Sequence, residues 1–165
     1  MGSDANDTMM DHRDQHQACV AVWMSQVAGG LSSAGLLRLL RGAFKLLWWR
    51  ARFTLGDVTL AAIVDRVLYT TSARFPVLAP LTVEATGIRF DELRQRIDAV
   101  PEGELAKGMS FALTEFLTVL GHLTAELLTP VLHEALSNVT LDAPEQPERE
   151  VPGQRGVREG RNCRG

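Results

Sequence analysis

The sequence contains few cysteines, few aromatic residues and no acidic residue over one long stretch. Its 165 residues include only two cysteines, Cys19 and Cys163, and neither belongs to a Cys-x-x-Cys pair. We therefore expect two free thiols in a reducing compartment, which favours a cytoplasmic protein. Aromatic residues make up 6% of the chain, and no Asp or Glu lies between Asp14 and Asp57.

The chain also lacks a complete catalytic, metal-binding or nucleotide-binding motif. Gly29-Gly30 is not part of a phosphate-binding glycine pattern. The first 16 residues are acidic, so we expect no cleavable signal peptide. Residues 15–37 contain no charged side chain but many glutamines, serines and glycines, so we predict no transmembrane helix. We predict a non-catalytic protein with no cofactor and no metal site.

Charge is distributed unevenly along the chain, whose formal net charge is −3. Residues 1–16 carry a net charge of −3, and residues 17–56 carry five cations and no anion. Residues 57–141 hold 11 acidic and 6 basic residues, and residues 142–165 hold five of each. A cationic segment attached to an acidic body predicts contact with that body or with a second copy of it. Nucleic acid is not an expected partner, because the acidic body would repel phosphate.

A basic stripe marks the cationic segment. At about 100° per residue, Arg38, Arg41, Lys45 and Arg52 fall on one side of a helix. That helix must bury its opposite side in a core, in a partner or in a membrane surface. Trp48-Trp49 next to two arginines is typical of an interfacial anchor, although Trp48 packed at the edge of a core is the preferred interpretation. The opposite, apolar side consists of Leu39, Leu40, Ala43, Phe44 and Leu47.

Apolar residues recur at helical spacing along most of the chain, which predicts an all-α fold. We expect a small bundle of four to six helices with one irregular or short extended segment near 77–90. We expect disordered termini, an acidic one at 1–16 and a second at 142–165. The helical domain spans 17–141. Within it we predict a basic amphipathic segment at 17–53, helices at 57–75 and 91–99, and a long kinked helix or hairpin at 104–139.

The last of these segments carries the longest apolar repeat. Its seam has 3-4-3-4 spacing and predicts either the centre of the bundle or a dimer interface. Pro130 is expected to kink or split the helix near Thr129. The seam residues, which are our candidate interaction surface, are Leu113, Phe116, Leu120, Leu123 and Leu127.

Four polar residues lie opposite this seam. Glu115, His122, Glu126 and His133 are spaced 7, 4 and 7 and would share one face of an unbroken helix. Two carboxylates and two imidazoles could bind a metal, but Pro130 breaks the helical phase. The Glu-x-x-His spacing of bundle metal sites is also absent. A solvated face is the preferred interpretation.

Residues 116–132 read Phe-Leu-Thr-Val-Leu-Gly-His-Leu-Thr-Ala-Glu-Leu-Leu-Thr-Pro-Val-Leu. Over these 17 residues the chain resembles the phosphoacceptor region of bacterial histidine kinases, in which an apolar turn precedes a His followed by Glu, Leu, Arg, Thr and Pro. The resemblance implies phosphotransfer on His122, with Glu126 as the neighbouring acid. The chain departs from the pattern, because Glu126 lies four residues after His122 and Leu128 replaces the Arg.

These observations favour a small interaction or regulatory module, most simply in bacterial signalling, that acts through protein–protein contacts and forms homo-oligomers. The first alternative is a membrane-associated protein held on an anionic membrane surface by the basic helix at 34–53. The second is a histidine phosphotransfer protein that uses His122. Whether segment 18–53 packs in the core, docks a partner or lies on a membrane is left open by the sequence.

Overall fold

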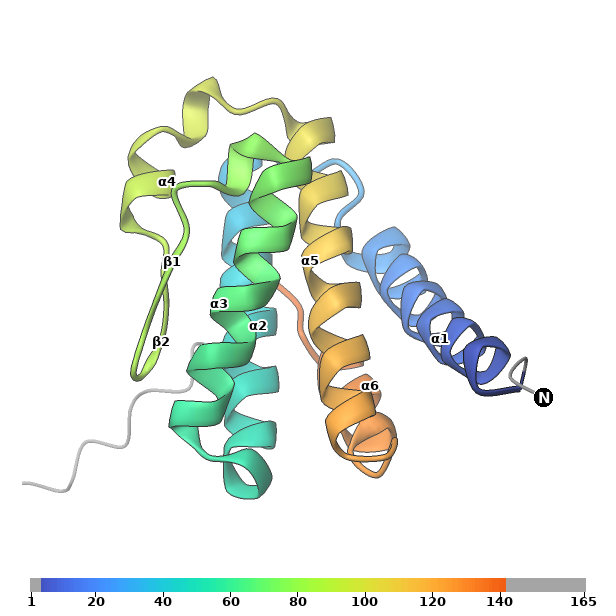
Figure 1. The fold of residues 1–165 in the computed structure, drawn as a ribbon. Helices are drawn as coiled ribbons and strands as arrows, with labels where there is room; N and C mark the ends of the chain where they lie inside the picture. The colour runs from blue at the N-terminus through green and yellow to red at the C-terminus, as the bar shows by residue number, and fades with distance from the viewer. Residues whose placement is uncertain (1–3, 142–165) are drawn as a thin grey trace, which may run out of the picture.

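Six α-helices account for most of the chain in the computed structural model, which describes the backbone of residues 4–141 and the side chains of residues 11–141 (Figure 1). This confirms the predicted all-α bundle. The predicted tail at 142–165 lies outside the described residues. The helices are α1 (Asp4–Val27), α2 (Ser33–Leu55), α3 (Asp57–Arg74), α4 (Asp91–Gln95), α5 (Glu102–Leu123) and α6 (Thr129–Ser137).

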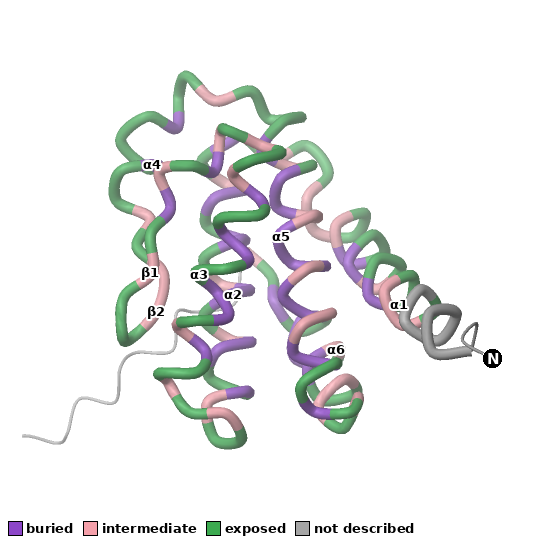
Figure 2. The backbone as a smooth tube through the Cα atoms, in the orientation of Figure 1, coloured by how far each residue is buried: buried purple, intermediate pink, exposed green. Residues whose placement is uncertain are grey.

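Helix α5 lies at the centre of the fold. It packs against α1, α2, α3 and α6 (Figure 1). Figure 2 shows buried residues along its length, on the sides that the neighbouring helices cover. Removing apolar surface from water stabilises such a core by roughly 25 cal/mol per Å², so this one helix contributes a large part of the stability. Its fully buried side chains include Leu105, Met109, Ala112, Leu113, Phe116, Leu117 and Leu120.

Helices α2 and α3 form a tight hairpin beside α5. The Ser32 hydroxyl caps α2 by accepting a hydrogen bond from the Gly35 backbone N–H at 3.2 Å. Gly56 connects the two helices with φ +79°, a conformation that glycine adopts without strain. The Asp57 carboxylate then accepts hydrogen bonds from the Trp48 indole at 2.9 Å and from Arg52 at 3.2 Å, which fixes the turn.

The segment between α3 and α5 is irregular, as predicted, and includes a short extended part. A 3₁₀ turn, η1 (Pro76–Leu78), precedes two antiparallel strands, β1 (Thr82–Glu84) and β2 (Gly87–Arg89). Strand β1 packs against α3 and strand β2 against α2. In place of one helix over 91–99, the chain forms α4 followed by a second 3₁₀ turn, η2 (Ile97–Ala99).

Helix α1 differs most from the sequence-based expectation. Disorder was predicted through residue 16, but the helix begins at Asp4 and runs without interruption to Val27. The helix packs along α5 and α6, and these tertiary contacts compensate for its weak apolar periodicity.

The predicted break in the last helical segment is confirmed. Helix α5 ends at Leu123, and α6 begins at Thr129 with Pro130 in its first turn, where a missing N–H costs nothing. Between the helices, Ala125 and Glu126 adopt left-handed backbone conformations with φ +48° and φ +63°. Such conformations cost free energy in residues other than glycine, so local contacts must hold them.

Candidate functional site

The predicted apolar seam is divided between core and surface. Leu113, Phe116 and Leu120 are fully buried against neighbouring helices of the same chain, so they form the centre of the bundle. Leu123 and Leu127 are 57% and 80% exposed. The first three residues are therefore unavailable to a partner in this fold, and only the last two remain accessible.

The basic stripe lies on the outer side of α2. Arg38, Arg41 and Lys45 are exposed, and Arg52 is partly exposed. Leu39, Leu40, Ala43, Phe44 and Leu47, which lie on the opposite side, are buried in the bundle. The structure thus resolves what covers this apolar side: it is the protein's own core.

Two large aromatic side chains extend the stripe toward the end of α2. Trp49 is 54% exposed and Phe53 is 76% exposed, whereas Trp48 is buried at the edge of the core as expected. The Arg52 guanidinium lies over both exposed rings, 5.2 Å from the centroid of Trp49 and 5.9 Å from that of Phe53. We call the combined surface the basic-aromatic face; it consists of Arg38, Arg41, Lys45, Trp49, Arg52 and Phe53.

A second group of polar residues joins α1 to α6. His16 on α1 is 1% exposed, and its Nδ1 lies 2.9 Å from Nε2 of His133 on α6. The Nε2 of His16 lies 3.5 Å from a carboxylate oxygen of Glu126. Glu126 also accepts a hydrogen bond from the Thr129 hydroxyl. We call these four residues the histidine cluster.

The backbone of the α5–α6 connection places Glu126 in this cluster. The Glu126 N–H donates to the Gly121 carbonyl at 2.7 Å, which supports its left-handed conformation. A Cβ atom at Gly121 would lie only 2.6 Å from a Glu126 carboxylate oxygen. The absence of a side chain at Gly121 therefore gives the carboxylate room to reach His16 and Thr129.

Burial and the nearby carboxylate act in opposite directions on the two imidazoles. Desolvation lowers the pKa of His16 below its ordinary value, and the Glu126 carboxylate partly offsets this. Neighbouring His133 and His12 lower the pKa of His16 further. Desolvation also lowers the pKa of His133, again against the attraction of Glu126. Burial thus favours the neutral form of both imidazoles.

The histidine singled out by the kinase resemblance lies elsewhere. His122 is exposed in the last turn of α5. Within the described residues, no hydrogen bond or ion pair joins it to Glu126, whose carboxylate contacts Thr129 and His16. The helical i, i+4 arrangement assumed from the sequence does not form, because α5 ends between the two residues.

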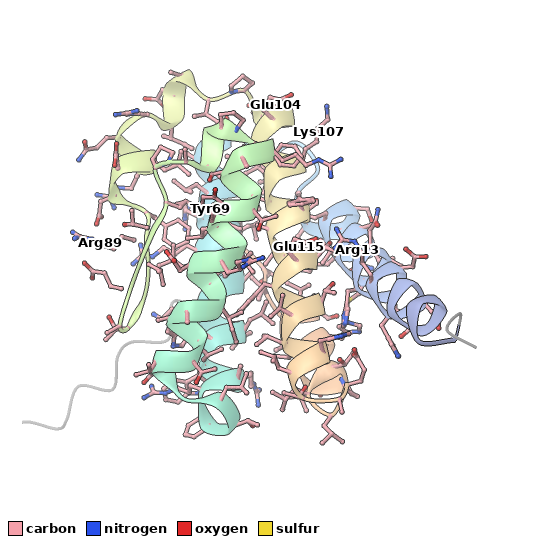
Figure 3. The ribbon with its side chains drawn as sticks, viewed as in Figure 1. Arg13, Tyr69, Arg89, Glu104, Lys107 and Glu115 are labelled. Atoms are coloured by element: carbon pink, nitrogen blue, oxygen red, sulfur yellow. The ribbon has the colours of Figure 1, made fainter. Side chains whose placement is uncertain are left out.

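The expected solvated face is also wrong for most of its residues. Glu115 forms an ion pair with Arg13 of α1, and the two labelled side chains meet between α1 and α5 (Figure 3). Glu126 and His133 contact His16 and are partly buried, so His122 alone of the four falls among the exposed residues. The sequence pattern missed this because residues 1–16 were expected to be disordered. Arg13 and His16 have the i, i+3 spacing of residues on one side of a helix. This spacing is the one sequence feature that could have indicated that they contact the rest of the bundle.

A groove of about 760 Å³ lies between α3 and the first strand. Apolar residues such as Ile63, Leu81 and Val119 line much of it. Its lining includes the charged side chains of Asp65 and Arg66 and the hydroxyl groups of Thr59, Tyr69, Ser72 and Thr82.

Comparisons with known proteins add no functional information. No protein-family model matches the chain, and neither the curated proteins nor the solved structures searched include a match. Across residues 4–141, no three or more His, Cys, Asp or Glu residues are grouped so that they could hold a metal ion. None of the helices in this part of the chain has the length and apolarity needed to cross a bilayer.

Proposed function

We propose that this protein is a non-catalytic helical interaction module that acts through the basic-aromatic face of α2. The observation that carries the proposal is the exposure of Trp49 and Phe53 beside Arg52 on a helix whose other side is fully used by the core. Tryptophan and arginine are the residue types most enriched among those that dominate binding energy at protein interfaces. A regulatory role, exerted by binding and release, fits such a surface.

Charge favours a protein partner with an acidic surface. Arg38 and Lys45 continue the face away from the two aromatic rings, so a partner covering it must supply negative charge. A second copy of this chain meets that requirement, because residues 57–141 contain five more acidic than basic residues. Asp98 and Glu102 are exposed near the start of α5, as is Glu104, which pairs with Lys107, and such carboxylates could supply this charge. Homo-oligomerisation is therefore the preferred form of the interaction.

A second candidate is binding to an anionic membrane surface. Arg52 stacked on two exposed aromatic rings resembles the arrangement in which rings lie at headgroup depth and cations approach lipid phosphate. The buried apolar side of α2 weighs against this candidate. A bound α2 could insert only Trp49 and Phe53 at its end, together with Val58 at the start of α3.

Light scattering on the purified chain tests the proposal. We expect a dimer that dissociates at high salt, because screening weakens contacts between exposed charges. The double variant Arg38→Glu/Lys45→Glu should shift the protein toward the monomer. The matched control Arg66→Glu/Arg94→Glu makes the same change in net charge at two exposed cations of α3 and α4 and should leave the dimer intact.

Co-sedimentation with vesicles containing anionic lipid separates the two candidates. A monomer that binds these vesicles, and loses binding in Trp49→Ala/Phe53→Ala, would replace the protein interaction by membrane association. A monomer at all concentrations that ignores the vesicles would contradict both candidates. Circular dichroism on each variant shows whether the helical fold is retained.

A further inference from the structure

The contact between His16 and His133 depends on how many protons the two imidazoles carry. Two ring nitrogens 2.9 Å apart share one hydrogen bond, so one of them must donate and the other must accept. The neutral pair is satisfied when the His133 Nε2–H donates to a bare Nδ1 on His16. We assign this tautomer because it leaves the Nε2–H of His16 facing the Glu126 carboxylate, 3.5 Å away.

The cluster accommodates one additional proton but not two. A proton added to Nδ1 of His133 leaves the shared hydrogen bond in place. A further proton on Nδ1 of His16 would point an N–H at another N–H, and the contact between the rings would be lost. Two imidazolium cations with centroids 5.1 Å apart would also repel each other.

The charged and titratable groups around His16 cannot neutralise a second cation. The α5–α6 connection supplies Glu126, a single carboxylate that is already shared with Thr129. Helix α1 supplies His12, whose charge would add to the repulsion, and Cys19 one turn further on, whose burial raises the pKa of its thiol and keeps it neutral. Helix α5 supplies Glu115, which is engaged by Arg13.

Residues 11–19 of α1 depend mainly on polar contacts for their position. Between residues 11 and 27, the buried side chains of α1 are His16, Val20 and Trp23. Val20 and Trp23 lie further along the helix, where the Trp23 indole donates to the Val139 carbonyl at 3.0 Å. Within residues 11–19, the helix contacts the bundle through His16, through Arg13, which pairs with Glu115 and lies 6.0 Å from the ring centroid of Phe111, and through the partly buried Cys19.

We propose that the His16–His133 contact is an acid-sensitive latch that releases residues 11–19 of α1 from α5 and α6 under mildly acidic conditions. Val20 and Trp23 keep the following part of the helix in place, so the change is local. Release uncovers the surface of α5 and α6 around Glu115 and His133. This inference does not depend on the function proposed for the basic-aromatic face.

Hydrogen–deuterium exchange of the full chain tests the latch. Amide protection of residues 11–19, corrected for the intrinsic rate, should fall roughly tenfold or more between about pH 7.5 and about pH 5.0. Protection in the buried part of α5 around Phe116 should stay unchanged, which separates release of α1 from global unfolding. Unchanged protection of residues 11–19 in the wild-type chain would overturn the proposal.

Two variants connect the change to the cluster. In His133→Gln, the amide can still donate to His16 but cannot be protonated, so the pH effect on residues 11–19 should shrink to less than about twofold. His122→Gln removes an exposed histidine of α5 outside the cluster and should behave as wild type. A pH effect that persists undiminished in His133→Gln would also overturn the latch.

If His133→Gln already loosens α1 at neutral pH, the variant cannot report on the pH effect, and a measurement on the wild-type chain is used instead. Nuclear magnetic resonance follows the imidazole signals of His16 and His133 together with the backbone amides of α1. The latch requires the amide shifts of residues 11–19 to change with the same midpoint as the imidazoles. Amides that do not follow the imidazole titration would contradict it.

Discussion

Replacing Gly121 by alanine tests whether the Glu126 carboxylate is held where the structure has it. A Cβ atom at this position would lie 2.6 and 2.7 Å from the two carboxylate oxygens and 2.9 Å from the carboxyl carbon. These separations are too short for non-bonded atoms, so the Glu126 side chain must leave. Its departure removes the hydrogen bond from Thr129 and the acceptor nearest to the buried Nε2 of His16.

The expected change in the free energy of unfolding combines two opposing effects. Alanine in place of glycine stabilises a helix by at most about 1 kcal/mol. A hydrogen bond to a charged group contributes about 1.5–3 kcal/mol. Since Glu126 is partly exposed and can be rehydrated after displacement, we take the lower end of this range for the bond from Thr129. Gly121→Ala should therefore lower the stability by about 0.5–1.5 kcal/mol.

Urea denaturation, followed by circular dichroism, measures this change as a shift of the midpoint at constant slope. Gly103→Ala is the matched control, because Gly103 also lies in α5 and a Cβ atom added there would have no neighbouring atom within 4 Å. That variant should be as stable as wild type or up to about 1 kcal/mol more stable. If Gly121→Ala behaves like Gly103→Ala, the Glu126 carboxylate does not occupy the place described above.

Three further predictions address the core and the pH response. Because folding lowers the pKa values of His16 and His133, the unfolded chain binds protons at a higher pH than the folded chain does. Stability to urea should therefore fall as the pH drops through about 6.5 toward the folded pKa values. A stability that rises over this interval would contradict the neutral cluster. Trp23→Phe removes the hydrogen bond to a carbonyl in a buried contact and should cost about 1–3 kcal/mol in calorimetry or urea unfolding; an unchanged midpoint would show that the indole makes no such bond. Leu120→Ala should lower the free energy of unfolding by about 2–5 kcal/mol, because Leu120 is fully buried. Leu127→Ala, at an exposed position, should change it by less than about 0.5 kcal/mol. Equal effects would show that both leucines share one environment.

Helical periodicity was sufficient to predict most of the bundle. Leu113, Phe116 and Leu120 were predicted to share one apolar side, and they form the buried centre. Pro130 was predicted to kink or split the last helical segment near Thr129, and α6 begins at Thr129. Local rules worked here because apolar spacing, caps and prolines act within a few residues of where they occur.

The seam leaves the core where the backbone changes direction without a glycine or proline at that point. Leu123 and Leu127 continue the spacing in the sequence, but α5 ends at Leu123. Ala125 and Glu126 then take left-handed conformations that residues of these types rarely adopt. Contacts of Glu126 with Gly121 and Thr129 stabilise this turn, and such contacts leave no periodic pattern.

The histidine cluster could not be predicted because its residues are distant in sequence. His16 and His133 are 117 residues apart, and the segment that carries His16 lacks the apolar repeat that would have predicted a helix. The charge pattern instead suggested a disordered acidic terminus. The cluster became visible only when α1, α5 and α6 were placed together in three dimensions.

The residues that α1 contacts lie far from it in the sequence, and this has a consequence during synthesis. The indole of Trp23 bonds to a carbonyl 116 residues later, so this contact cannot form until the end of the helical domain has left the ribosome. At about 5–20 residues per second, the first helix waits on the order of ten seconds for its partners. Few apolar residues precede Val20 in this helix. This composition lowers the risk of aggregation during the wait, because a polar, acidic segment stays hydrated while the rest of the chain is translated.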